Sequence, residues 1–68
     1  MSKTMRDSIL EAGQMHYEAL INKHKVNVLN ILHNSVGVAE HPDVMETIEA
    51  ELTKMAHYRD LLEEINHF

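Results

Sequence analysis

The chain of 68 residues contains no cysteine, one proline and two glycines, and only 4% of its residues are aromatic. Without cysteine no disulfide can stabilise the fold, and nothing in the composition indicates an oxidising compartment. No window approaches the roughly 18 consecutive apolar residues of a membrane span. The first seven residues also lack the apolar run of a secretory signal. We therefore expect a protein of the cytoplasm that does not bind a membrane.

The short length of the chain limits the core that it can build. A domain of about this size buries only about 60% of the surface that its unfolded chain exposes. Below roughly 70 to 80 residues, a single core rarely supplies more than about 3–5 kcal/mol of stability. Because disulfides are excluded, self-association or a bound metal would have to supply the rest.

The charges are unevenly distributed along the chain, whose net charge is −5. Residues 1–39 carry four basic and three acidic side chains, a net charge of +1, whereas residues 40–68 carry two basic and eight acidic ones, a net charge of −6. This difference favours one half lying beside the other, although an exposed ion pair contributes only about 0–1 kcal/mol. No basic stripe is present, so we expect no nucleic-acid partner.

Residues 33–43 hold the main break in an otherwise helical pattern. Gly37 can take the left-handed conformation that ends a helix, and Pro42 suits the first turn of the next one. The fold expected is therefore all-α: a single-domain, antiparallel two-helix hairpin with a long first helix. The predicted elements are a helix over about 3–36, a corner at 37–41 and a helix over about 42–67.

The two predicted helices differ in length. A corner near residues 38–39 pairs positions whose numbers sum to about 77, so the first helix overhangs the second by about two turns. Met5 and Ile9 lie in this overhang without cover from their own chain. Gly13 either admits the backbone of another segment or is tolerated at a cost of roughly 1 kcal/mol.

The first helix has apolar residues on two sides when it is plotted at 100° per residue. We expect one side to pack on the second helix, and it consists of Leu10, Tyr17, Leu20, Ile21, Val28, Ile31 and Leu32. We expect the opposite side to contact another chain, so that hairpins associate into a bundle, and it consists of Met5, Ala12, Met15, Ala19, Val26 and Leu29. Exposure of its small residues to water is the alternative.

The second helix has one apolar stripe and an acidic back. The stripe expected to face the first helix consists of Val44, Ile48, Leu52, Met55, Tyr58, Leu62 and Ile65. Its spacing of three and four residues is typical of an amphipathic helix. The opposite side, which we call the acidic back, consists of Glu46, Glu49, Thr53, His57, Asp60 and Glu64.

Six histidines raise the question of metal binding. His33, Glu40 and His41 could converge at the corner, but histidines near a helix end also interact favourably with its free carbonyl groups. We favour this second interpretation and expect neither metal nor cofactor. His24 differs because it falls on the apolar side of the first helix, where a histidine is most often a core residue with a hydrogen-bond partner. No serine or threonine has the histidine–carboxylate setting of a nucleophile, so we expect no enzymatic activity.

One segment resembles a known group of proteins. Residues Asn34 to Val44 read Asn-Ser-Val-Gly-Val-Ala-Glu-His-Pro-Asp-Val. This run is similar to one in small uncharacterised proteins of marine tailed phages, which share the chain length, the glycine before a Glu-His-Pro/Ser-Asp corner and an acidic amphipathic second helix. The similarity covers roughly the second half of the chain. It implies an infected bacterial cytoplasm as the setting and no catalytic residues.

These observations order three hypotheses about function. The first is a non-enzymatic, phage-type accessory protein that forms a homo-oligomer and binds a host or phage protein. The alternative is a sponge that sequesters a nucleotide signal between subunits, with cationic and aromatic ligand contacts from Arg6, Tyr17, Lys23 and Lys25. The third is a component of the virion or of its assembly.

Overall fold

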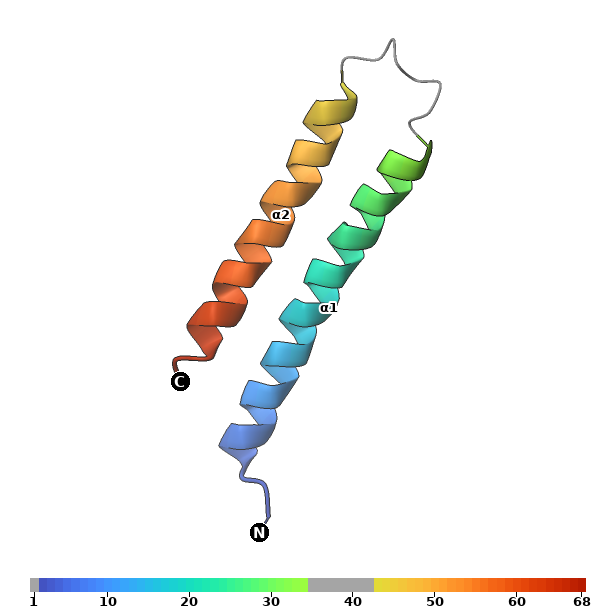
Figure 1. The fold of residues 1–68 in the computed structure, drawn as a ribbon. Helices are drawn as coiled ribbons and strands as arrows, with labels where there is room; N and C mark the ends of the chain where they lie inside the picture. The colour runs from blue at the N-terminus through green and yellow to red at the C-terminus, as the bar shows by residue number, and fades with distance from the viewer. Residues whose placement is uncertain (1, 35–42) are drawn as a thin grey trace.

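The computed structural model describes residues 2–34 and 43–68. They form two α-helices, α1 (Met5–Asn34) and α2 (Val44–Ile65), which lie side by side and run in opposite directions (Figure 1). The described residues contain no strand. The all-α helical hairpin is thus confirmed, as an elongated body of 58 × 17 × 10 Å. No helix of the described part combines the length and the apolar content of a membrane span.

Local hydrogen bonds stabilise the first turn of each helix. At the start of α1 the Thr4 hydroxyl accepts a bond from the Asp7 backbone N–H at 3.0 Å, and the Asp7 carboxylate accepts one from the Thr4 N–H at 3.4 Å. This reciprocal arrangement is a capping box. At the start of α2 the Asp43 carbonyl accepts the Thr47 N–H at 2.9 Å, and Glu46 places negative charge in the first turn. The predicted corner and Pro42 lie outside the described residues.

The pairing of the two helices matches the predicted register. Gly13 lies against Ile65, Gln14 donates a hydrogen bond to Asn66 at 2.7 Å, and the rings of Tyr17 and Tyr58 stack with centroids 6.5 Å apart. The numbers of these pairs sum to between 75 and 80, near the predicted 77. α1 extends beyond the end of α2 (Figure 1). In this overhang Met5 and Ile9 are 76% and 61% exposed.

The core between the helices is thin. Among the described residues the buried side chains are those of His24, Ile48 and Met55. Most of the predicted stripe residues are half-buried, but Leu32 and Leu52 are exposed, contrary to the prediction. In α2 the side facing α1 follows a strict four-three spacing, through Val44, Ile48, Glu51, Met55, Tyr58, Leu62 and Ile65. Glu51 therefore takes the place that the sequence pattern assigned to Leu52.

Gly13 has a packing role that differs from the predicted one. A methyl group at this position would overlap the terminal carbon of the Ile65 side chain. The glycine therefore makes room for a side chain at the end of α2, and the hypothesis that it admits a backbone is wrong. This contact closes the core at the end of the hairpin where the two chain termini lie (Figure 1).

Candidate functional site

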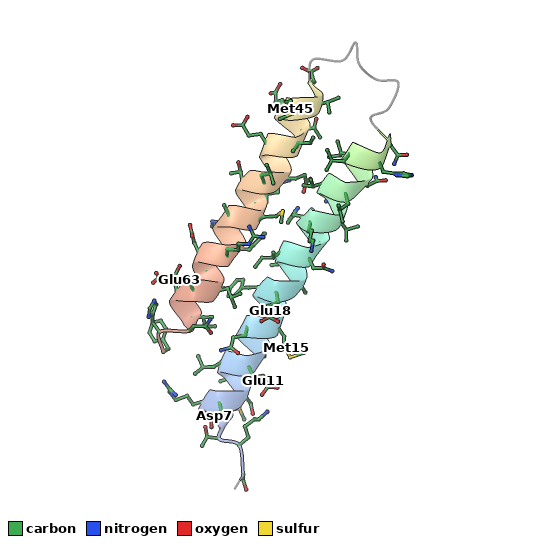
Figure 2. The ribbon with its side chains drawn as sticks, viewed as in Figure 1. Asp7, Glu11, Met15, Glu18, Met45 and Glu63 are labelled. Carbon is green, nitrogen blue, oxygen red and sulfur yellow. The ribbon has the colours of Figure 1, made fainter. Side chains whose placement is uncertain are left out.

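The predicted contact residues for another chain share the side of α1 that points away from α2. Met15, Val26 and Leu29 are 62%, 53% and 54% exposed, and Figure 2 shows Met15 directed away from α2. We call this side the outer face; it comprises Met5, Ala12, Met15, Ala19, Val26 and Leu29, all of them exposed. Within the described residues, α2 leaves the outer face open to solvent.

The surface of the outer face is not uniform along α1. Near the N-terminal end the surface has a shallow hollow of about 190 Å³, lined by Lys3, Ser8, Glu11, Ala12 and Met15. Lys3 and Glu11 form an ion pair at its edge. Toward the other end the Val26 and Leu29 side chains are also exposed. The hollow lies in the N-terminal half of the outer face.

A second group of polar residues lies between the helices. We call His24, Asn27 and Glu51 the polar cluster. His24 is 6% exposed, and its Nδ1 lies 2.5 Å from Oε2 of Glu51. Asn27 donates a hydrogen bond to the same oxygen at 3.2 Å. The His24 ring also stacks on Tyr58, with centroids 5.8 Å apart, so its predicted role as a core histidine with a polar partner is confirmed.

The electrostatics of the polar cluster favour a charged carboxylate. The hydrogen bond from His24 lowers the pKa of Glu51 below its usual value of 4.5, and the bond from Asn27 lowers it further. Partial desolvation of the carboxylate opposes both effects but does not outweigh them. The cluster is therefore a satisfied polar contact within an apolar interface, and its groups are occupied by one another.

The candidate ligand residues of the sponge hypothesis do not come together within one chain. Tyr17 is half-buried against Tyr58 in the helix interface, and Arg6 lies in the exposed overhang. Lys23 and Lys25 are exposed and, being two residues apart, point to different sides of α1. A shared site would require groups from a second subunit.

The metal candidates can be placed only in part. His33 is exposed in the last turn of α1, where the capping interpretation puts it. Glu40 and His41 lie outside the described residues. In residues 2–34 and 43–68, no three histidine or acidic side chains are grouped closely enough to hold a metal ion.

The acidic back forms the opposite edge of the hairpin. Glu46, Glu49, Asp60 and Glu64 are all exposed, and Figure 2 shows the neighbouring Glu63 on the side of α2 away from α1. The two open surfaces of the molecule therefore differ in chemistry: the outer face of α1 is apolar, and the back of α2 is acidic.

No family model, no curated protein and no solved structure matches this chain.

Proposed function

We propose that this protein is a non-enzymatic interaction protein that self-associates through the outer face of α1 and binds a host or phage protein through the acidic back of α2. The observation that carries the proposal is the outer face, a row of apolar side chains between Met5 and Leu29 that its own chain leaves exposed. Monomeric soluble proteins rarely expose contiguous apolar patches larger than a few hundred Å².

The total surface of the chain supports self-association. Its accessible area is 5526 Å², whereas a compact monomer of 7.9 kDa is expected to expose about 4,400 Å². The excess of roughly 1,100 Å² is larger than the approximately 800 Å² that each partner buries in a standard interface. An isolated hairpin therefore leaves more surface in water than a protein of this size usually does.

The acidic back supports a partner with a basic surface. The half of the chain that contains α2 carries a net charge of −6, and complementary charge raises association rates at low ionic strength. The likeness of residues 34–44 to small proteins of tailed phages supports an infected bacterium as the setting in which that partner is met.

Light scattering tests self-association. We expect the wild-type protein to have at least twice the mass of one chain, and the combined substitutions Met15→Glu and Val26→Glu to reduce it to about 7.9 kDa. Burial of unpaired charges in an apolar contact is strongly unfavourable. Met45→Glu and Phe68→Glu are matched controls, because these side chains are 68% and 75% exposed but lie off the outer face. A monomeric wild type would refute the proposed assembly.

Capture from bacterial lysate tests the acidic back. We expect the wild-type protein to retain a specific protein at low salt, and the combined substitutions Glu49→Gln and Asp60→Asn to lose it, because screening and neutralisation weaken the same attraction. Thr53→Ala is the control, an uncharged change on the same side of α2. Equal retention by the wild type and the neutralised variant would exclude the acidic back as the binding surface.

A further inference from the structure

The outer side of α1 carries a regular repeat as well as an apolar face. Positions spaced alternately by three and four residues run along the whole helix: Met5, Ser8, Ala12, Met15, Ala19, Asn22, Val26, Leu29 and His33. All nine residues are exposed, and we call them the outer seam. This spacing is the seven-residue repeat by which two helices pack along a common seam. The outer seam therefore has the form of a helix–helix contact without its second helix.

We propose that the outer seam packs against the outer seam of a second copy in antiparallel orientation, with Ala12 opposite Leu29 of the partner subunit and Met15 opposite Val26 of the partner subunit. The inference rests on the proposed self-association and specifies its geometry. Paired positions have numbers that sum to 41, so the two-fold axis passes between the two α1 helices, at the level midway between Ala19 and Asn22.

The position of the hollow favours this orientation. The hollow lined by Ser8, Ala12 and Met15 lies in the N-terminal half of the outer seam, and the exposed Val26 and Leu29 lie in the C-terminal half. The antiparallel arrangement places Leu29 of the partner subunit over Ala12 in this hollow, so that a large side chain meets a small one there, and it places Val26 of the partner subunit beside Met15. A parallel arrangement would place hollow on hollow, and unfilled space loses dispersion contacts.

The charges of α1 favour the same orientation. Residues 2–20 carry two basic and three acidic side chains, whereas residues 21–34 carry two basic and no acidic ones. Antiparallel packing brings the positive half of each helix beside the negative half of its partner, whereas parallel packing brings the two positive halves together. At the border of the seam Glu18 comes within about 3 Å along the helix axis of the partner subunit's Lys25, twice by symmetry. Both side chains are exposed and form no ion pair within the described residues.

Asn22 gives the proposed contact a preferred register. It is exposed, and its side chain makes no hydrogen bond within the described part of the chain. In the antiparallel dimer the two copies of Asn22 flank the two-fold axis, where their amides can bond to each other. An asparagine within a helix–helix seam commonly specifies register, because shifted pairings leave its amide buried without a partner.

Cysteine cross-linking tests the orientation in the full chain, which has no cysteine of its own. The variants Ala12→Cys and Leu29→Cys are oxidised separately and as a mixture, and covalent dimers are read from a non-reducing gel. In the antiparallel dimer two copies of the same position are about 25 Å apart, too far for a disulfide. We therefore expect a covalent dimer from the mixture and none from either variant alone. Met15→Cys and Val26→Cys repeat the test one layer further along.

The other outcomes separate the two proposals. If each variant cross-links alone, the dimer is parallel, and the inference fails while self-association stands. If Ala12→Cys joins Asn22→Cys and not Leu29→Cys, the register is shifted by one repeat, and the inference fails in the same way. If no combination cross-links and light scattering finds only single chains, the proposed self-association fails as well.

Discussion

The contact between His24 and Glu51 joins polar side chains of the two helices across an apolar interface. A hydrogen bond within a protein adds only about 0.5–1.5 kcal/mol of net stability, because folding exchanges it for bonds to water. The contact has a clearer effect on the register in which α1 and α2 pair. A slip by one helical repeat would place Glu51 opposite Tyr17 or Ile31, where the carboxylate would lose both of its hydrogen-bond donors. The polar cluster therefore selects one register among those that the apolar residues permit.

Substitution of Glu51 tests this role. We expect Glu51→Ala to lower the free energy of unfolding more than Glu51→Gln, because the amide oxygen of glutamine still accepts a bond from His24 or Asn27. Glu49→Ala, on the exposed back of α2, should change it by no more than about 0.5 kcal/mol. Urea unfolding monitored by circular dichroism measures all three. Equal effects of the two Glu51 substitutions would show that the hydrogen bonds are unimportant.

The lowered pKa of Glu51 predicts a pH dependence of stability. Because the folded state holds the carboxylate charged, this group stabilises the fold above its unfolded pKa, near 4.5. That contribution is lost as the pH falls through the lower pKa of the folded state. The difference in unfolding free energy between wild type and Glu51→Gln should therefore shrink as the pH falls below about 4.5. A difference that grew under acid would contradict the assignment.

The two partners of this contact were not equally predictable. The sequence pattern predicts a partner for His24, because a histidine on an apolar side of a helix usually has one, whereas it assigns Glu51 neither to the apolar stripe nor to the acidic back. Glu51 and Leu52 are adjacent in the sequence and lie about 100° apart around the helix axis. An error of one residue in the assumed repeat therefore exchanges the inward and the exposed position. A strict alternation of four and three residues through Ile48 and Met55 assigns the inward position to Glu51, as the structure shows.

At the scale of the elements, most of the fold follows from sequence periodicity. The long proline-free segment and the stripe from Val44 to Ile65 determine two helices, and the position of the corner fixes their register. Leu32 and Leu52 were misplaced because the helix interface is narrower than the apolar stripes. With one thin contact line, residues at the edge of a stripe remain in water.

The contact between Gly13 and Ile65 gives a prediction for this interface. Alanine is favoured over glycine in a helix by roughly 1 kcal/mol, but its methyl group would meet the Ile65 side chain. In an Ile65→Val background the obstructing carbon is gone, at a cost of about 0.5–1.5 kcal/mol. We therefore expect Gly13→Ala to stabilise that background by about 1 kcal/mol and the wild type by less. Thermal unfolding of the wild type, the two single variants and the double variant measures the coupling between positions 13 and 65. A gain from Gly13→Ala of the same size in both backgrounds would exclude this coupling.

At the scale of the whole molecule, α1 is the central element of the proposed dimer. A helix that is apolar on two opposite sides suits a position between other helices. With α2 on one side and the partner subunit's α1 on the other, the four helices form a layer. The two acidic backs then lie at its outer edges, where their mutual repulsion is smallest.

The shape of the dimer can be predicted from this layer. The proposed axis lies near the middle of the hairpin, so each subunit spans the same stretch of the long direction. We expect small-angle X-ray scattering to give twice the mass of one chain and a maximum dimension that stays near 58 Å. An end-to-end assembly would have a maximum dimension close to twice that value and would contradict the layer.

The thin core has a consequence for the abundance of the protein in a cell. Since few side chains are buried within one hairpin, much of the stability of the proposed dimer would come from contacts between chains. Its folded fraction would then depend on the rate of synthesis. At low expression, separate chains would be open to proteases, and at high expression they would survive as dimers. The response to gene dosage would therefore be steeper than linear.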